Sequence, residues 1–162
     1  MNALVHIALA VCSLLLGTLV FLNPKGNRQH RLLGVLYSLS MLGMNFTALG
    51  IYHITGRFNF FHLTALISLA MVVTGWTQVL LRRHLRNWLY RHYIYMCWSY
   101  AALIAAAFNE GFVRLAPLKS LVRNSGNWVI IATQIVLLSA AALIINRSKP
   151  AMLKRYGNTT VA

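Results

Sequence analysis

The sequence predicts an all-α membrane protein that crosses the bilayer five times, and two observations carry this prediction. Of its 162 residues, 59% are hydrophobic and only 10% are charged, whereas a soluble domain has about 25% charged residues. Five stretches are apolar over roughly the 20 residues that a helix needs to cross the hydrocarbon core. Because backbone groups inside lipid must be paired within their own segment, each stretch is predicted to be a helix.

The predicted spans are residues 4–22, 32–51, 60–81, 92–112 and 128–145, within a single transmembrane domain over residues 1–146. The first span has neither the basic start nor the small-residue cleavage site of a signal peptide, so we expect it to be retained. Short connections favour an up-down four-helix bundle for the first four spans. The fifth is predicted to be a supporting span, residues 113–127 a loop, and residues 147–162 a basic cytoplasmic tail.

The cations are unevenly distributed between the predicted loops. Eleven of the fifteen Lys and Arg residues fall in the first loop, the third loop and the tail: Lys25, Arg28, Arg31, Arg82, Arg83, Arg86, Arg91, Arg147, Lys149, Lys154 and Arg155. The other four are Arg57, Arg114, Lys119 and Arg123. The positive-inside rule therefore predicts an outside N-terminus and a cytoplasmic C-terminus in a bacterial inner membrane. The net charge is +14. We expect the basic residues to contact anionic lipid head groups at the cytoplasmic face and not to bind nucleic acid.

No short motif identifies an activity, and the chain leaves open whether it is an enzyme. Phosphate-binding loops, G-x-S-x-G and H-E-x-x-H are absent, which removes the common nucleotide-binding, hydrolase and metalloprotease signatures. Cys12 and Cys97 lack a second cysteine at metal or redox spacing and are interpreted as small buried apolar residues. A homo-oligomer and a membrane redox partner both remain compatible with the sequence.

The predicted topology sorts the histidines into two layers. Helix direction places His6, His53 and His62 near the outer surface, together with Glu110, and His30, His84 and His92 near the inner surface. Intramembrane ionisable residues usually face the bundle interior and mark functional sites. We therefore predict an outer polar layer of His6, His62 and Glu110, with His53 nearby, and an inner layer of His30 and His92.

Glu110 is the only carboxylate side chain in the chain, and two interpretations of it remain open. It lies eighteen residues after His92, which is five helical turns, so both side chains project from one face roughly 27 Å apart. This pattern favours a buried carboxylate that interacts with imidazoles on neighbouring helices. The alternative is an interfacial ion pair with Arg114, four residues further on the same face. For the histidines, the alternative is a position at the lipid head groups, above all for His84 and His53.

Three segments resemble the bacterial membrane family known as domain of unknown function 2306. They are KGNRQHRLLGVLYSLSML, NFTALGIYHITGRFNFFHLTALISL and WLYRHYIYMCWSYAALIAAAFNEGFVRL. The likeness covers about residues 5–117. It rests on His-Arg-x-x-Gly at His30 to Gly34, on Phe-His at Phe61 and His62, and on His92 with Met96, Trp98, Ser99 and Tyr100. It implies a membrane architecture and no activity. In layout alone, the alternating histidines are similar to two-haem transmembrane cytochromes b.

Three functional hypotheses follow. In the first, the protein is a membrane redox protein that binds haem b, with His6 and His62, and His30 and His92, as axial ligands on diagonal helices. Glu110 would then tune or protonate the outer site. In the second, His6, His62 and Glu110 bind a divalent metal such as zinc. In the third, the chain is a non-catalytic scaffold, accessory subunit or lipid-binding protein.

Overall fold

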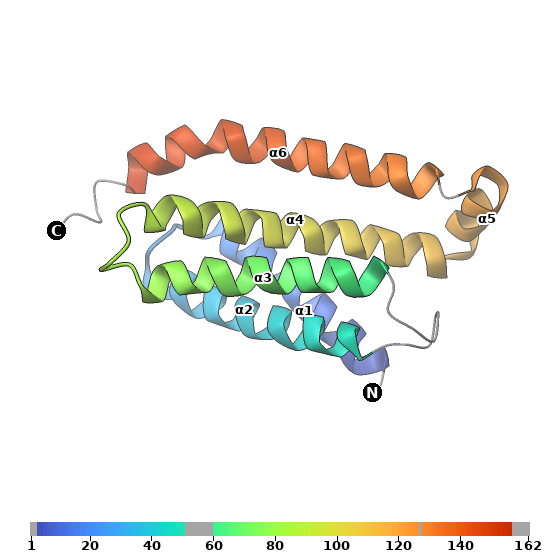
Figure 1. Cartoon of the computed structure of the whole chain (residues 1–162), viewed down its shortest axis with the longest axis horizontal. Helices are drawn as coiled ribbons and strands as arrows, with labels where there is room; N and C mark the ends of the chain where they lie inside the picture. Colours follow the sequence, from blue (N-terminus) through green and yellow to red (C-terminus); the bar gives the residue numbers. More distant parts are fainter. Residues whose placement is uncertain (1–2, 51–59, 127, 157–162) are drawn as a thin grey trace.

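The computed structural model describes residues 3–50, 60–126 and 128–156, and within these ranges the regular secondary structure is all helical, without a strand. Its helices are α1 (Ala3–Leu22), α2 (Arg28–Leu49), α3 (Phe60–Leu80), α4 (Trp88–Arg114), α5 (Ala116–Ser125) and α6 (Trp128–Tyr156) (Figure 1). The predicted all-α class is therefore confirmed.

Four helices, α1, α2, α3 and α6, are each long and apolar enough to cross a membrane. The fourth helix, α4, meets the same criterion only together with α5, from which it is separated by a bend of 88°. With 27 residues, α4 is about 40 Å long and so reaches across a bilayer core. The described chain is thus a multi-pass membrane protein with four or five spans.

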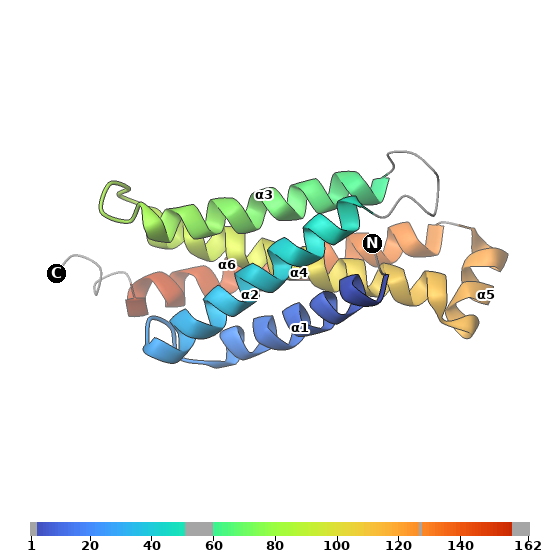
Figure 2. The same ribbon diagram turned by 90° about the horizontal axis from the view of Figure 1, so that it is seen from below.

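Helices α1 to α4 enclose one core. In the described residues, α1 packs against α2 and α4, and α3 packs against α2 and α4, whereas no extensive contact joins α1 to α3 or α2 to α4. Seen from below, α2 lies between α1 and α3 (Figure 2). The buried centre of this core consists of Tyr37, Met41, Met44, Val72 and Leu103. The last helix, α6, packs outside this group against α4 and α5.

The turn between α1 and α2 is closed by side chains at both helix ends. Lys25 Nζ donates to the carbonyl oxygens of Val20, Phe21 and Asn23 at 2.9, 2.7 and 2.8 Å. A lysine at this place satisfies carbonyls that the end of a helix leaves unpaired. Asn27 is the N-cap of α2, and its side chain accepts from the backbone N–H of His30 at 2.7 Å. The first turn of α2, and His30 within it, is therefore held in place.

The connection over residues 113–127 is not the predicted loop, because it contains α5. Pro117 stands at the start of this helix, where its missing N–H costs nothing. Leu118, Leu121 and Val122 recur at helical spacing and give α5 one apolar face. A search for spans of 20 residues passes over a ten-residue helix of this kind.

The predicted tail is also partly helical, since α6 continues beyond residue 145 to Tyr156 and includes Pro150. Contacts with α4 hold this extension. Tyr93 donates its hydroxyl to the carbonyl oxygen of Ile145 at 3.1 Å, and the Lys149 ammonium lies 4.3 Å from the centre of the Tyr90 ring. The predicted boundary at residue 146 thus falls inside a helix, while residues 157–162 lie outside the described part.

Candidate functional site

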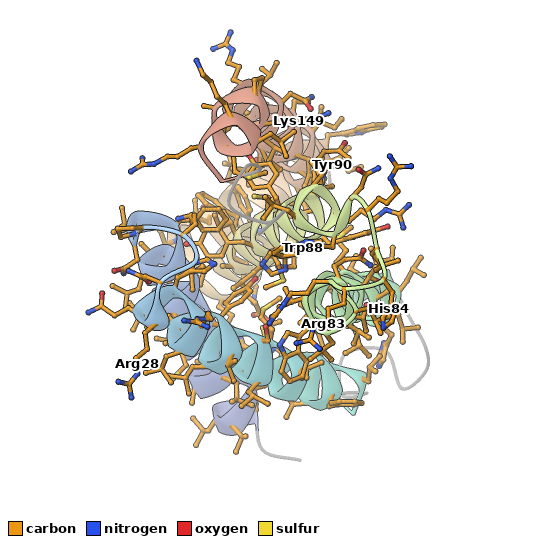
Figure 3. The ribbon with its side chains drawn as sticks, turned by 90° about the vertical axis from the view of Figure 1, so that its left-hand side faces the viewer. Arg28, Arg83, His84, Trp88, Tyr90 and Lys149 are labelled. Carbon is orange, nitrogen blue, oxygen red and sulfur yellow. The ribbon has the colours of Figure 1, made fainter. Side chains whose placement is uncertain are left out.

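The histidines lie at the two ends of the molecule. The α1–α2 turn, the α3–α4 turn and the C-terminal part of α6 share one end, here called the basic end (Figure 1). Figure 3 views this end, where Arg28 of α2, Arg83 of the α3–α4 turn and Lys149 of α6 are labelled. His30 and His92 stand in the first turns of α2 and α4 at the basic end, and His6 and His62 near the starts of α1 and α3 at the opposite end.

At the basic end, His92 is oriented by the neighbouring helix. Its Nδ1 lies 2.8 Å from the carbonyl oxygen of Gly75 in α3. A carbonyl only accepts, so Nδ1 carries the hydrogen, and in the neutral imidazole Nε2 then keeps its lone pair. Gly75 makes this contact possible, because a Cβ there would lie 2.7 Å from Met96 Sδ and 3.3 Å from Tyr95 Cβ. The close approach of α3 and α4 thus sets the direction of the His92 ring.

His30 lies at the same end of the molecule as His92. The two imidazoles are close enough to interact electrostatically, and His30 also lies within range of the Lys25 charge. The His30 Nδ1 atom is buried and makes no hydrogen bond of good geometry among the described residues, although the Val20 backbone lies close to the ring. Buried polar nitrogens are nearly always paired, so an exception needs an explanation such as an absent ligand or water.

Lys25 adds a positive charge beside this pair. Its ammonium group is partly buried in the α1–α2 turn, and this burial lowers the pKa of Lys25 below the usual lysine value. The sequence identified Lys25 only as one of several loop cations. Its capping role depends on how tightly the turn closes, which hydropathy and charge counts do not report.

At the opposite end, His6 is held by α2. Its Nδ1 lies 3.0 Å from Thr47 Oγ1 and 3.2 Å from the carbonyl oxygen of Met44. Thr47 itself donates to that carbonyl at 2.7 Å, so the His6 Nδ1–H is the donor to both oxygens. His62, on α3, is almost fully buried with 2% of its surface exposed.

Glu110 does not join this pair, and the predicted burial of its carboxylate is wrong. Its side chain is 49% exposed and pairs with the guanidinium of Arg114 one turn later, as in the alternative interpretation. The pKa of Arg114 is raised by this hydrogen bond. The reason lies in helix length: α4 has 27 residues, whereas α1, α2 and α3 have 20 to 22. Near its end, no other helix of the core covers α4.

The described residues contain no group of three or more His, Cys, Asp or Glu side chains placed to hold a metal ion. In particular, His6, His62 and Glu110 are not brought together in that way. His84 is exposed in the α3–α4 turn (Figure 3), and His53 lies outside the described residues. Of the two cysteines, Cys97 is buried as predicted, but Cys12 is exposed on the surface of α1.

Comparison with known families identifies the chain. Residues 3–148 match the family described as "Predicted membrane protein (DUF2306)". The chain belongs to this family. The match reaches further than the resemblance over residues 5–117, because it includes α5 and most of α6. No curated protein and no solved structure matches the chain.

Between the two histidine pairs, this DUF2306 protein has a polar seam that is buried at Tyr37 and Ser99 and exposed at Thr18. Ser99 donates to the Met96 carbonyl oxygen at 2.9 Å, so the Tyr37 hydroxyl, 2.9 Å from Ser99 Oγ, is the donor in that contact. The Tyr100 hydroxyl likewise donates to Thr18 Oγ1 at 2.6 Å. These bonds tie α1 and α2 to α4.

Proposed function

We propose that this DUF2306 protein is a membrane-embedded electron carrier that binds haem b between His30 and His92. One observation carries the proposal: the imidazoles of His30 on α2 and His92 on α4, two helices without extensive contact in the described structure, lie at the same end of the core within electrostatic range of each other. Histidine imidazoles are common haem ligands, and His30 and His92 would hold the group here. Haem would supply one-electron chemistry, and the chain would supply its ligands and a water-poor surrounding.

The protonation pattern of the basic-end pair fits this donor set. Histidines that bind metals almost always donate their other ring N–H to a carbonyl or carboxylate, which fixes the tautomer. The His92 Nδ1–H to Gly75 carbonyl contact at 2.8 Å is of this kind. His30 contributes a buried Nδ1 that makes no hydrogen bond of good geometry among the described residues. Burial of the His30 ring against protein alone would leave this nitrogen without a well-formed hydrogen bond.

The proposal includes a second haem, which His6 and His62 near the opposite end would hold. His6 belongs to α1 and His62 to α3, two helices that again do not pack on each other extensively in the described structure. His6 donates through Nδ1 to α2, as His92 donates to α3. With two sites near opposite ends, electrons would cross the membrane within one chain. Glu110 takes no part in this proposal.

We also propose that the basic end faces the cytoplasm of a bacterial cell and contacts anionic lipids there. Three cation-bearing segments gather at this end (Figure 3), and cytoplasmic loops carry an excess of Lys and Arg. Lys25 would then act on the His30–His92 site from the cytoplasmic side. A positive charge in electrostatic range favours the more negatively charged, reduced form of a one-electron centre.

The test is the absorption spectrum of the full-length protein, purified from cells supplied with haem precursor, before and after reduction with dithionite. A Soret band and a sharp α band on reduction are expected. His30→Ala and His92→Ala should each remove one site and halve the haem content if both sites bind, and His6→Ala and His62→Ala should remove the other half. His84→Ala is the matched control, because His84 is exposed at the same end.

A colourless wild-type protein would overturn the proposal, as would full haem content in both His30→Ala and His92→Ala. Colourless protein with stoichiometric zinc would favour the metal hypothesis. A colourless and metal-free sample would favour a non-catalytic scaffold or accessory subunit. One observation supports that last candidate: the buried contacts Tyr37–Ser99, Ser13–Ser40 and Asn45–Ser68 close the core with protein groups alone.

A further inference from the structure

We infer that α5 lies flat in the head-group layer at the face opposite the basic end, where Lys119 and Arg123 bind the phosphates of anionic phospholipids. This inference is independent of haem binding. It assigns a lipid-contact surface to the segment that the sequence predicted to be a loop. It also adds a second anionic-lipid surface to the one expected at the basic end.

The direction of α5 is the first observation. It turns by 88° from α4, so an α4 that crosses the bilayer leaves α5 parallel to the membrane plane. Among the described helices, α5 packs against α4 and α6. Figures 1 and 2 both show it at the extremity of the molecule, beyond the ends of the long helices. A helix at this depth and in this direction meets the boundary between acyl chains and water.

One face of α5 is apolar and the other is basic, as a helix at the boundary between acyl chains and water requires. Leu118 turns toward the end of α4, because its Cδ1 would lie 3.8 Å from a Cβ placed on Gly111. Leu121, on the same face, is 44% exposed, so part of the apolar face is left uncovered by protein. Lys119 and Arg123 are exposed and four residues apart, so they share the other face. Interfacial helices combine an apolar and a basic face in this manner.

The charges identify the partner. Glu110 is the only carboxylate side chain in the sequence, and it is already paired with Arg114. No acidic side chain in the chain therefore remains for Lys119 and Arg123. A hollow beside them is lined by Lys119, Ser120, Val122 and Arg123. A lipid phosphate with its acyl chains would place an anion at the two cations and apolar groups at the opposite face.

The experiment measures which lipid surrounds α5. An environment-sensitive fluorophore is attached at Leu121→Cys in full-length protein that also carries Cys12→Ser, because Cys12 is the exposed native thiol. The protein is reconstituted in equimolar phosphatidylglycerol and phosphatidylcholine. Brominated acyl chains, which quench on contact, are placed on the anionic lipid in one sample and on the zwitterionic lipid in the other.

Quenching by the anionic lipid should exceed quenching by the zwitterionic lipid. The local preference should fall about fivefold for each cation removed, the factor that corresponds to about 1 kcal/mol per cation near a membrane surface. Lys119→Gln with Arg123→Gln should bring the two lipids close to equal quenching. The charge-conserving pair Lys119→Arg with Arg123→Lys should keep the wild-type preference and controls for disturbance of the helix.

Three results would overturn the inference. Equal quenching by both lipids in the wild-type charge background would show that α5 does not select anionic lipid. Quenching by aqueous iodide and by neither lipid would place α5 in water. Protection from iodide and from both lipids would show that protein, such as a second copy of the chain, covers this face.

Discussion

The His92 side chain of α4 and the Gly75 backbone of α3 are joined at 2.8 Å between the ring Nδ1 and the carbonyl oxygen. The contact links helix packing to the candidate site, because it forms only when α3 and α4 approach closely enough for a glycine. The orientation of a proposed ligand therefore depends on a residue without a side chain. This dependence can be tested separately from the ligand itself.

Gly75→Ala should lower stability and disturb the His92 ring together. The added Cβ would lie 2.7 Å from Met96 Sδ, and although the thioether can move, such overpacking costs about 1–3 kcal/mol. Thermal unfolding in detergent and haem content are the measurements. Gly34→Ala is the matched control, since a Cβ there meets no atom within 4 Å. If both variants have the wild-type melting temperature and spectrum, the packing argument fails.

Gly17→Ala should be the more damaging glycine substitution. A Cβ at position 17 would overlap the ring edge of Tyr100, and the Tyr100 hydroxyl is held by Thr18 at 2.6 Å. The ring cannot withdraw without losing this bond, so we expect a cost at the upper end of about 1–3 kcal/mol. Adding Tyr100→Leu should recover part of the loss in a double-mutant cycle. Additive effects of the two changes would contradict the proposed clash.

Ser99→Ala should cost more stability than Tyr37→Phe, although both remove the same hydrogen bond. Tyr37→Phe leaves Ser99 still donating to Met96, and the loss should be about 0.6 kcal/mol, a typical value between membrane helices. Ser99→Ala instead leaves a hydroxyl on Tyr37, which is only 2% exposed, without its acceptor, and an unsatisfied buried group costs about 1–3 kcal/mol. Unfolding in mixed micelles can rank the two. The reverse order would show that Tyr37 finds another acceptor.

Glu110→Gln should change stability by no more than about 0.5 kcal/mol, because exposed ion pairs contribute little. Haem and metal content should also stay at the wild-type level, since the carboxylate points to Arg114 and not to the histidines. The same carboxylate raises the pKa of Arg114. The guanidinium therefore stays positively charged, and remains the donor in the ion pair, throughout the usual pH range. If Glu110→Gln lost a bound cofactor, the carboxylate would have to take part in cofactor binding, against this prediction.

Most of the apolar helices, and the end of the molecule at which four of the histidines lie, could be predicted from the sequence because both depend on local properties. Apolar length identifies a span, and the order of spans then determines which end of the molecule carries His6, His30, His62 and His92. Glu110 shows where such reasoning ends. Glu110 projects from the same face of α4 as His92. Whether a neighbouring helix covers that face at Glu110 depends on the relative lengths of α3 and α4, which the helical period does not report.

The same distinction applies to α5 and Lys25. A ten-residue amphipathic helix has a clear period but no span-length signal, so a segmentation by hydropathy treats it as a connection. The three carbonyl contacts of Lys25 depend on the path of a five-residue turn. The Tyr37–Ser99 and Tyr100–Thr18 pairs join residues more than 60 positions apart, and a single sequence carries no direct signal for such pairings.

The unequal sharing of contacts among the helices has a consequence for how the protein is made. The most extensive interfaces are α1 with α2 and α3 with α4, and each pair is joined by a short turn at the basic end. Each pair can therefore enter the bilayer as a helical hairpin as it leaves the ribosome. The Tyr37 hydroxyl gains its acceptor, Ser99, only after α4 has been synthesised, so the first hairpin becomes complete only when the second docks against it.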